Sequence, residues 1–249
     1  MATDPIEFER HNKLSAFSHV SSCGYQIGSR HPFTPSQMKQ LVAALQMPPQ
    51  TADHLLGGRG SVYRTHLDGV GPIMVKHYRR GGLLANLITR YYLRTTKTRG
   101  QIEFEQMELA RSLGCGAPEP VAYASCGRFF YRAWLVTREV KRSQTMAQLS
   151  HTSSERAAAA MTALRHQATI LIKNNIMHAD FHPGNVLVDE DDEVYLIDFD
   201  KTGIYRGGQK RLADKYRRRW CRAVQKHRLP QILCTLMQAG VSEHRDSKG

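Results

Sequence analysis

Two short polar motifs in the second half of the chain constrain its fold more than any other feature. In the first, HADFHPGN, Asp180 and Asn185 are five positions apart, and the second, DFD, begins thirteen positions later at Asp198. Phosphoryl transfer requires a carboxylate that takes the proton of an acceptor hydroxyl, together with an amide oxygen and a second carboxylate that hold Mg²⁺. The spacing therefore predicts a fold that brings these three side chains to one site.

Two elements earlier in the chain fit the same chemistry. Gly57, Gly58 and Gly60 precede a β-prone segment. Glycine lets backbone N–H groups approach a polyphosphate closely because it has no Cβ. Lys76 follows the apolar run IMV in the next predicted strand, beyond a turn at residues 68–69. Each element alone also fits an ordinary hairpin, but their combination with the two motifs favours a polyphosphate site.

Hydrophobic periodicity and turn residues define a coarse order of elements. Residues 1–33 carry no clear pattern. The predicted elements are a helix at 34–46 capped by Thr34, a hairpin at 55–78, a helix at 102–113, strands at 120–125 and 130–137, a long helix at 152–174, a short hairpin at 185–197 and a helical tail at 209–239. Strands come first and helices mostly follow, which predicts an α+β protein with a β-rich N-lobe and a mostly helical C-lobe.

The net charge of +13 is concentrated in two segments. Residues 76–100 hold seven Lys and Arg and no acidic residue, and residues 206–228 hold ten with one acidic residue. In residues 79–100 the basic side chains alternate with Leu, Ile and Tyr, which is typical of a segment at an anionic lipid interface. We therefore expect contact with an anionic membrane surface; the alternative is a solvated basic face.

Several classes of protein do not fit the sequence. No apolar run approaches the roughly 18–20 residues that span a bilayer, and the polar N-terminal residues do not resemble a secretory signal. The five cysteines show no CxxC motif, so we expect neither a disulfide framework nor a zinc site. This cysteine usage favours a reducing compartment. A nucleic-acid-binding protein is the alternative class that the basic charge suggests, but the chain has no zinc-finger or RNP motif.

Four ring side chains near the motifs have simple structural interpretations. His178 and His182 are four positions apart but lack an HExxH arrangement, so we do not expect them to bind a metal. We expect His178 to form a hydrogen bond with the loop backbone. Tyr216 and Trp220 lie at helical spacing in the basic tail. We expect both to pack against the core of the second lobe.

Beyond these patterns, the chain resembles the lipopolysaccharide kinases, a family with a protein-kinase-like fold, and within it the kinases of 3-deoxy-D-manno-octulosonic acid (Kdo). The resemblance spans about residues 53–230. The segments that carry it are KHYRRGG at 76–82, RYYL at 90–93, residues 99–104, 114–120 and 178–187, and LIDFDK at 196–201. It implies an N-terminal extension with a short helix at 1–52 and a kinase-like domain at 53–249, with an N-lobe at 53–140 and a C-lobe at 141–249.

The resemblance assigns roles to Lys76 and to three residues of the two motifs. It makes Lys76 the strand lysine of the ATP site and Asp180 the catalytic carboxylate. Asn185 and Asp198 become the ligands of Mg²⁺. The glycines at 57, 58 and 60 then cover the phosphates of ATP.

Two further residues of the ATP site follow from the resemblance. Glu103, on the predicted helix, becomes the ion-pair partner of Lys76, although spacing alone leaves Glu105 and Glu108 open. Glu139 follows the predicted strand at 130–137 and lies in the hinge against the adenine.

The resemblance implies ATP-dependent phosphorylation of a Kdo hydroxyl, usually at the 4-position, of Kdo–lipid A at the cytoplasmic face of the bacterial inner membrane. The sequence departs from ordinary protein kinases at Ala179, where they carry an arginine, and at Asp200, where they carry glycine. Few residues follow the DFD motif, which favours a non-protein acceptor. The alternative is a kinase of the same fold for a core heptose, a small metabolite or a protein; nucleic acid is not an expected partner.

Overall fold

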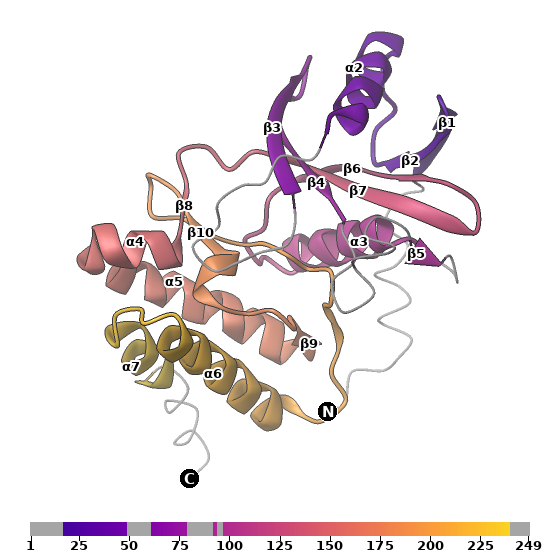
Figure 1. Ribbon diagram of the computed structural model, residues 1–249. Helices are drawn as coiled ribbons and strands as arrows, with labels where there is room; N and C mark the ends of the chain where they lie inside the picture. Colours follow the sequence, from indigo (N-terminus) through magenta and orange to yellow (C-terminus); the bar gives the residue numbers. More distant parts are fainter. Residues whose placement is uncertain (1–16, 49–60, 79–91, 94–96, 240–249) are drawn as a thin grey trace.

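The computed structural model describes residues 17–48, 61–78, 92–93 and 97–239, which form a mixed α+β structure (Figure 1). Its main element is an antiparallel seven-stranded sheet in the order β1-β2-β6-β7-β4-β3, with β5 beside β7. The strands are β1 (Ser18–Ser22), β2 (Tyr25–Ser29), β3 (Ser61–Leu67), β4 (Gly71–His77), β5 (Tyr92–Leu93), β6 (Pro120–Cys126) and β7 (Phe130–Arg138). The α+β prediction is confirmed.

Side-chain alternation along β4 separates Lys76 from its hydrophobic neighbours. Ile73 and Val75 are fully buried on one face of the sheet. Successive side chains of a strand point to opposite faces, so Lys76 lies on the other face. The β3–β4 hairpin turns at the predicted position, where Gly69 adopts a φ of +73° that favours glycine.

One helix covers each face of the sheet (Figure 1). α2 (Pro35–Gln46) begins at the predicted N-cap Thr34, whose side chain accepts a hydrogen bond from the N–H of Gln37, and it packs over Ile73 and Val75. α3 (Arg99–Ser112) packs against the opposite face along β6 and β7. It approaches the sheet closely at Gly100, where a Cβ would clash with the carbonyl oxygen of Trp134.

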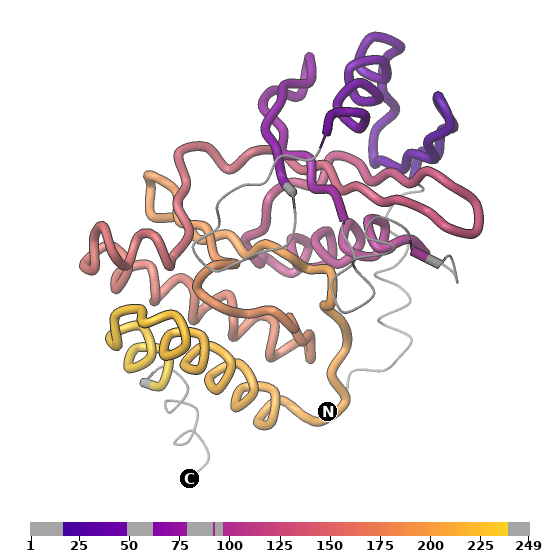
Figure 2. The backbone as a smooth tube through the Cα atoms, viewed as in Figure 1, coloured from indigo at the N-terminus to yellow at the C-terminus, as the bar shows by residue number. Residues whose placement is uncertain are grey.

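The second half of the chain is mostly helical, and the backbone trace shows it below the sheet (Figure 2). Its elements are α4 (Met146–Thr152), α5 (Ser154–Lys173), η2 (Pro183–Asn185), α6 (Gln209–Lys226) and α7 (Ile232–Ala239), the three-stranded sheet of β8 (Gln144–Thr145), β10 (Val186–Val188) and β11 (Val194–Leu196), and the pair β9 (Ile176–Met177) and β12 (Gly203–Ile204). The largest hydrophobic core joins this half to α3 through side chains such as Leu164, Phe181 and Trp220. None of the helices formed by the described residues is long and apolar enough to cross a membrane.

Two sequence expectations need correction in this half. The predicted helical tail at 209–239 is broken into α6 and α7, because Arg228 takes a φ of +52° and Pro230 cannot continue a helix. A disulfide also joins Cys221 of α6 to Cys234 of α7, whereas the cysteine pattern predicts no disulfide framework and a reducing compartment. The two cysteines become neighbours only because the chain folds back between the helices.

The hairpin of β1 and β2 has no counterpart among the predicted elements. Most side chains of β1 are exposed, so the sequence lacks the hydrophobic alternation by which a strand is recognised. β2 pairs with β6, so the sheet includes strands on the N-terminal side of residue 52. The division of the chain into domains at residue 52 stays a prediction. The glycine-rich segment at 57–60 and most of the basic segment at 79–100 lie outside the described residues.

Candidate active site

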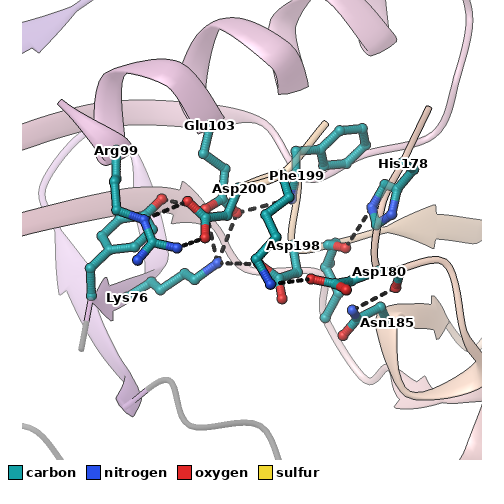
Figure 3. A network of polar contacts seen from close by, with 12 residues as sticks. Lys76, Arg99, Glu103, His178, Asp180, Asn185, Asp198, Phe199 and Asp200 are labelled. Carbon is teal, nitrogen blue, oxygen red and sulfur yellow. Dashed lines mark hydrogen bonds and ion pairs between the residues drawn. The ribbon is translucent and has the colours of Figure 1, made fainter. Parts of the chain in front are cut away.

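Lys76 of β4 lies between two carboxylates from distant parts of the chain (Figure 3). Its Nζ is 2.9 Å from both Oε1 and Oε2 of Glu103 on α3, and 2.7 Å from Oδ1 of Asp198. The strand lysine, the helix carboxylate and the first residue of the DFD motif are therefore linked through one ammonium group.

Glu103 is the carboxylate that meets Lys76, and it is only 1% exposed. Its Oε1 also accepts a hydrogen bond of 3.2 Å from the N–H of Phe199, and the Tyr78 hydroxyl donates to its Oε2. The two other candidates have different partners, since Glu105 pairs with Lys97 and Glu108 pairs with Arg30. Glu103 thus connects the sheet, α3 and the DFD segment.

The pKa values of the linked groups favour the charged pair. Burial alone would lower the pKa of Lys76, but the Glu103 and Asp198 carboxylates beside it raise that pKa overall. Burial alone would raise the pKa of Asp198, but the ammonium of Lys76 lowers it overall. An ionised carboxylate and a protonated amine at this position are what binding of a metal ion and of phosphate oxygens requires.

Asp180 and Asn185 lie on one loop next to Asp198 (Figure 3). Hydrogen bonds to backbone groups hold this loop in place. The side-chain amide of Asn185 donates a hydrogen bond of 2.9 Å to the carbonyl oxygen of Asp180, and the N–H of Ile197 donates to the carbonyl oxygen of Asn185 at 3.0 Å. The His182 ring accepts a hydrogen bond from the N–H of Gly184. The structure therefore brings the three motif residues together, as their spacing predicted.

The carboxylate of Asp180 contacts two basic side chains. Nζ of Lys201 is 3.4 Å from its Oδ2, and a guanidinium nitrogen of Arg219 on α6 is 3.4 Å from its Oδ1. A third basic group, Arg99 at the start of α3, pairs with Asp200 and donates to the hydroxyl of Tyr92. The Asp200 that replaces glycine thus anchors the DFD segment to the sheet half.

Four of these residues were not among the predicted site residues: Tyr78, Arg99, Lys201 and Arg219. The first three lie in segments that carry the family resemblance, and this could have marked them as candidates. Arg219 gave no signal of its own, because it lies in a run of three arginines and only the fold shows which of them reaches Asp180.

His178 is buried and structural, as expected. Its ring nitrogen Nε2 lies 3.0 Å from the carbonyl oxygen of Ile197, and its ring packs edge-on against Phe199. The backbone N–H of His178 donates a hydrogen bond to the Tyr216 hydroxyl. Tyr216 and Trp220 are buried as well, which confirms their predicted packing role. Within the described residues, no three His, Cys, Asp or Glu side chains gather into a metal site.

Burial lowers the pKa of His178 to about 4, which predicts a pH dependence of stability. Between pH about 6.5 and 4 the unfolded chain binds a proton on this ring that the folded chain does not. As the pH falls through this window, the free energy of unfolding should therefore fall by up to about 1.4 kcal/mol per pH unit because of this group. Urea unfolding at several pH values measures this slope. His178→Gln should have a flatter slope in that window than the parent; an equal slope would contradict the assignment.

The donor set of the site fits Mg²⁺. The amide nitrogen of Asn185 is held by a backbone carbonyl, so the amide presents its oxygen as the remaining donor, and Asp198 is ionised. Mg²⁺ is commonly held by one or two protein oxygen ligands together with substrate phosphates. Asn185 and Asp198 would supply two such ligands.

Two parts of the predicted ATP site stay predictions. Gly57, Gly58 and Gly60 lie outside the described residues. Glu139 follows β7, where its N–H donates to the carbonyl oxygen of Pro72 and its carboxylate pairs with Arg64 at 2.7 Å. Its position at the end of the sheet agrees with a hinge, but both of these groups are engaged within the protein.

A strand lysine paired with a helix glutamate, facing an Asp–Asn–Asp set, is the arrangement typical of protein-kinase-like phosphotransferases. The sequence pattern of the lipopolysaccharide kinase (Kdo/WaaP) family matches residues 57–232, and the chain belongs to this family.

Individual relatives are similar at modest identity. A 3-deoxy-D-manno-octulosonic acid kinase of Vibrio vulnificus is 29% identical over 147 residues, which are 58% of this chain and 61% of that protein. A kinase of the same name from Vibrio cholerae is 28% identical over 66% of this chain and 73% of its own length. One from Xylella fastidiosa is 27% identical over 73% of this chain and 68% of its length. The match to the Vibrio vulnificus kinase spans about three fifths of that relative.

Proposed function

We propose that this protein transfers the γ-phosphate of ATP to a Kdo hydroxyl, the 4-hydroxyl in particular, of Kdo–lipid A at the cytoplasmic face of the inner membrane. The observation that carries the proposal is the Lys76–Glu103–Asp198 ion pair beside the Asp180–Asn185 loop, in a chain of the lipopolysaccharide kinase family. The sheet half and the helical half then correspond to the two lobes of a kinase-like fold. The named relatives support Kdo as the acceptor sugar.

Each residue of the site has a task in this reaction. Lys76, held by Glu103, binds phosphate oxygens of ATP from the sheet side. Asp180 orients the acceptor hydroxyl and takes its proton as the new oxygen–phosphorus bond forms, while the bond from the γ-phosphorus to the bridging oxygen breaks and ADP leaves. Asn185 and Asp198 would hold Mg²⁺, which neutralises the charge of the phosphates when bound. The hydrogen bonds within the loop keep these groups in place before the substrates arrive.

The basic side chains at Asp180 support an acidic acceptor. Lys201 and Arg219 approach Asp180 from separate elements, and both are substantially exposed. At 3.4 Å these are loose ion pairs, so an anionic group of the incoming acceptor can replace the carboxylate as their partner. Kdo carries a carboxylate and lipid A carries phosphates, so the proposed acceptor supplies such groups.

Removing both cations should weaken binding of the acceptor and leave ATP binding intact. For Lys201→Met/Arg219→Met we expect the KM for Kdo–lipid A to rise by at least about tenfold, because charge-assisted contacts to the acceptor are lost. The KM for ATP should stay unchanged, since the ammonium of Lys76 is not altered.

Steady-state kinetics with each substrate varied in turn measures both values. Arg222→Met is the matched control, because Arg222 is an exposed arginine of the same helix for which no contact with Asp180 is observed. An unchanged KM for the acceptor in the double variant, or an equal rise in the control, would show that these residues do not position the acceptor.

Mass spectrometry of lipid A–core from cells with and without this protein tests the proposed function in vivo. We expect one phosphate on the Kdo residue only when the protein is present, and its loss when Asp180→Asn replaces the parent chain. A phosphate that instead appears and disappears on a heptose of the core would assign the protein to another acceptor.

A further inference from the structure

The hairpin of β6 and β7 ends in an exposed aromatic tip. Phe129 is 70% exposed and Phe130 is 55% exposed, the highest values for large hydrophobic side chains in the part of the chain that the structure describes. Two adjacent phenylalanines in water are unfavourable for an isolated protein, and exposed apolar groups of this kind mark interaction sites. The tip lies at the end of the long hairpin that extends beyond α3 and β5 (Figure 1).

The position of the tip is fixed by the residues beneath it. Gly127 has a φ of +110°, and a Cβ there would clash with the carbonyl oxygen of Phe130, so the turn requires glycine. β5 pairs with β7 at the next residues, and the rings of Tyr92 and Tyr131 are buried with their centroids 5.7 Å apart. The two phenylalanines therefore project from a rigid base.

A basic side chain accompanies the two rings at the tip. The guanidinium of Arg128 lies 5.2 Å from the centre of the Phe129 ring. No acidic residue occurs between Cys126 and Trp134. Aromatic rings next to basic groups are typical of segments that lie at a membrane interface, where rings enter the apolar boundary and cations meet anionic headgroups.

The sequence gives a second reason to place a membrane here. The basic segment at 79–100, for which we predicted contact with anionic lipid, includes β5, and β5 pairs with β7 beside the tip, at Phe130 and Tyr131. Within the described residues, β5 and the tip are therefore adjacent. A protein partner fits less well, because two rings provide far less than the roughly 1,200 Å² that a specific protein interface buries.

We propose that the tip at residues 128–130 docks into the headgroup region of an anionic bilayer and holds the protein at the membrane. The inference rests on the proposed function, because a lipid acceptor requires the protein to work at a membrane. Phe129 and Phe130 supply the apolar contact, and Arg128 supplies the charge that selects anionic lipid.

Co-sedimentation with phosphatidylglycerol–phosphatidylethanolamine vesicles tests the proposal. Phe129→Ser/Phe130→Ser should lower the fraction bound by a factor of at least about ten, because the variant loses the two rings that would enter the bilayer. Phe129→Trp/Phe130→Trp should restore binding, since tryptophan also suits the interface. The matched control is Ile204→Ser, which removes an apolar side chain of 50% exposure from β12; its binding should equal that of the parent.

Three results would overturn the proposal. They are unchanged vesicle binding in the double serine variant, an equal loss in the Ile204→Ser control, and a soluble dimer that the serine variant abolishes without any change in vesicle binding. Phosphate transfer to Kdo–lipid A in detergent micelles separates this inference from the proposed function. Tip-dependent vesicle binding without transfer in micelles would uphold the docking surface and reject the proposed reaction.

Discussion

Replacing Asp180 with asparagine should lower kcat for phosphate transfer by at least about 10²-fold, because the amide cannot accept the proton of the acceptor hydroxyl. The KM for ATP should change little, since Lys76 and Asp198 hold their positions through contacts that do not involve this side chain. The fold should also persist, because the contact that joins Asp180 to Asn185 uses the backbone carbonyl of Asp180.

Phosphate transfer and ATP-dependent thermal stabilisation, measured on the same preparations, test this expectation. Asp191→Asn provides the matched control, because Asp191 is an exposed aspartate in the turn between β10 and β11. The control should transfer phosphate at the parental rate. A rate near that of the parent in Asp180→Asn would remove this carboxylate from the chemistry.

Replacing Lys76 with methionine should be the second large effect, with kcat/KM for ATP lower by at least about 10²-fold, because the charge on the phosphates loses its fixed partner. The same change leaves Glu103 buried without its cation. Breaking a buried ion pair in this way should lower the free energy of unfolding by roughly 3 kcal/mol.

A second variant separates activity from stability. In Lys76→Met/Glu103→Gln the buried carboxylate is also removed, so most of the lost free energy of unfolding should return while the activity stays low. Urea unfolding and ATP kinetics on both variants give the two readouts. If the double variant regained activity together with stability, Lys76 would be a structural group and not a ligand of the phosphates.

The sequence predicted the parts of the site that depend on local spacing. Asp180 and Asn185 lie on one short loop, and Asp198 follows a strand that pairs beside it, so their spacing along the chain translates directly into proximity. The β3–β4 hairpin could also be predicted from the sequence, because the turn at Gly69 and the apolar run before Lys76 are local signals.

The remaining features depend on how distant elements pack. Spacing could not choose among the three glutamates of α3, because which of them faces β4 depends on the rotation of the helix against the sheet. The contact of Arg219 with Asp180 likewise requires the docking of α6 beneath the loop. The hairpin of β1 and β2 escaped prediction because it is stabilised by pairing with β6 and its first strand is largely exposed.

Incubation of the purified protein with ATP, Mg²⁺ and Kdo–lipid A, followed by mass spectrometry of the lipid, tests the central claim most directly. The account predicts one added phosphate on the Kdo residue, at the 4-hydroxyl by fragmentation, and no addition with Asp180→Asn. Absence of transfer to Kdo–lipid A, with a heptose-containing core accepted under the same conditions, would contradict it.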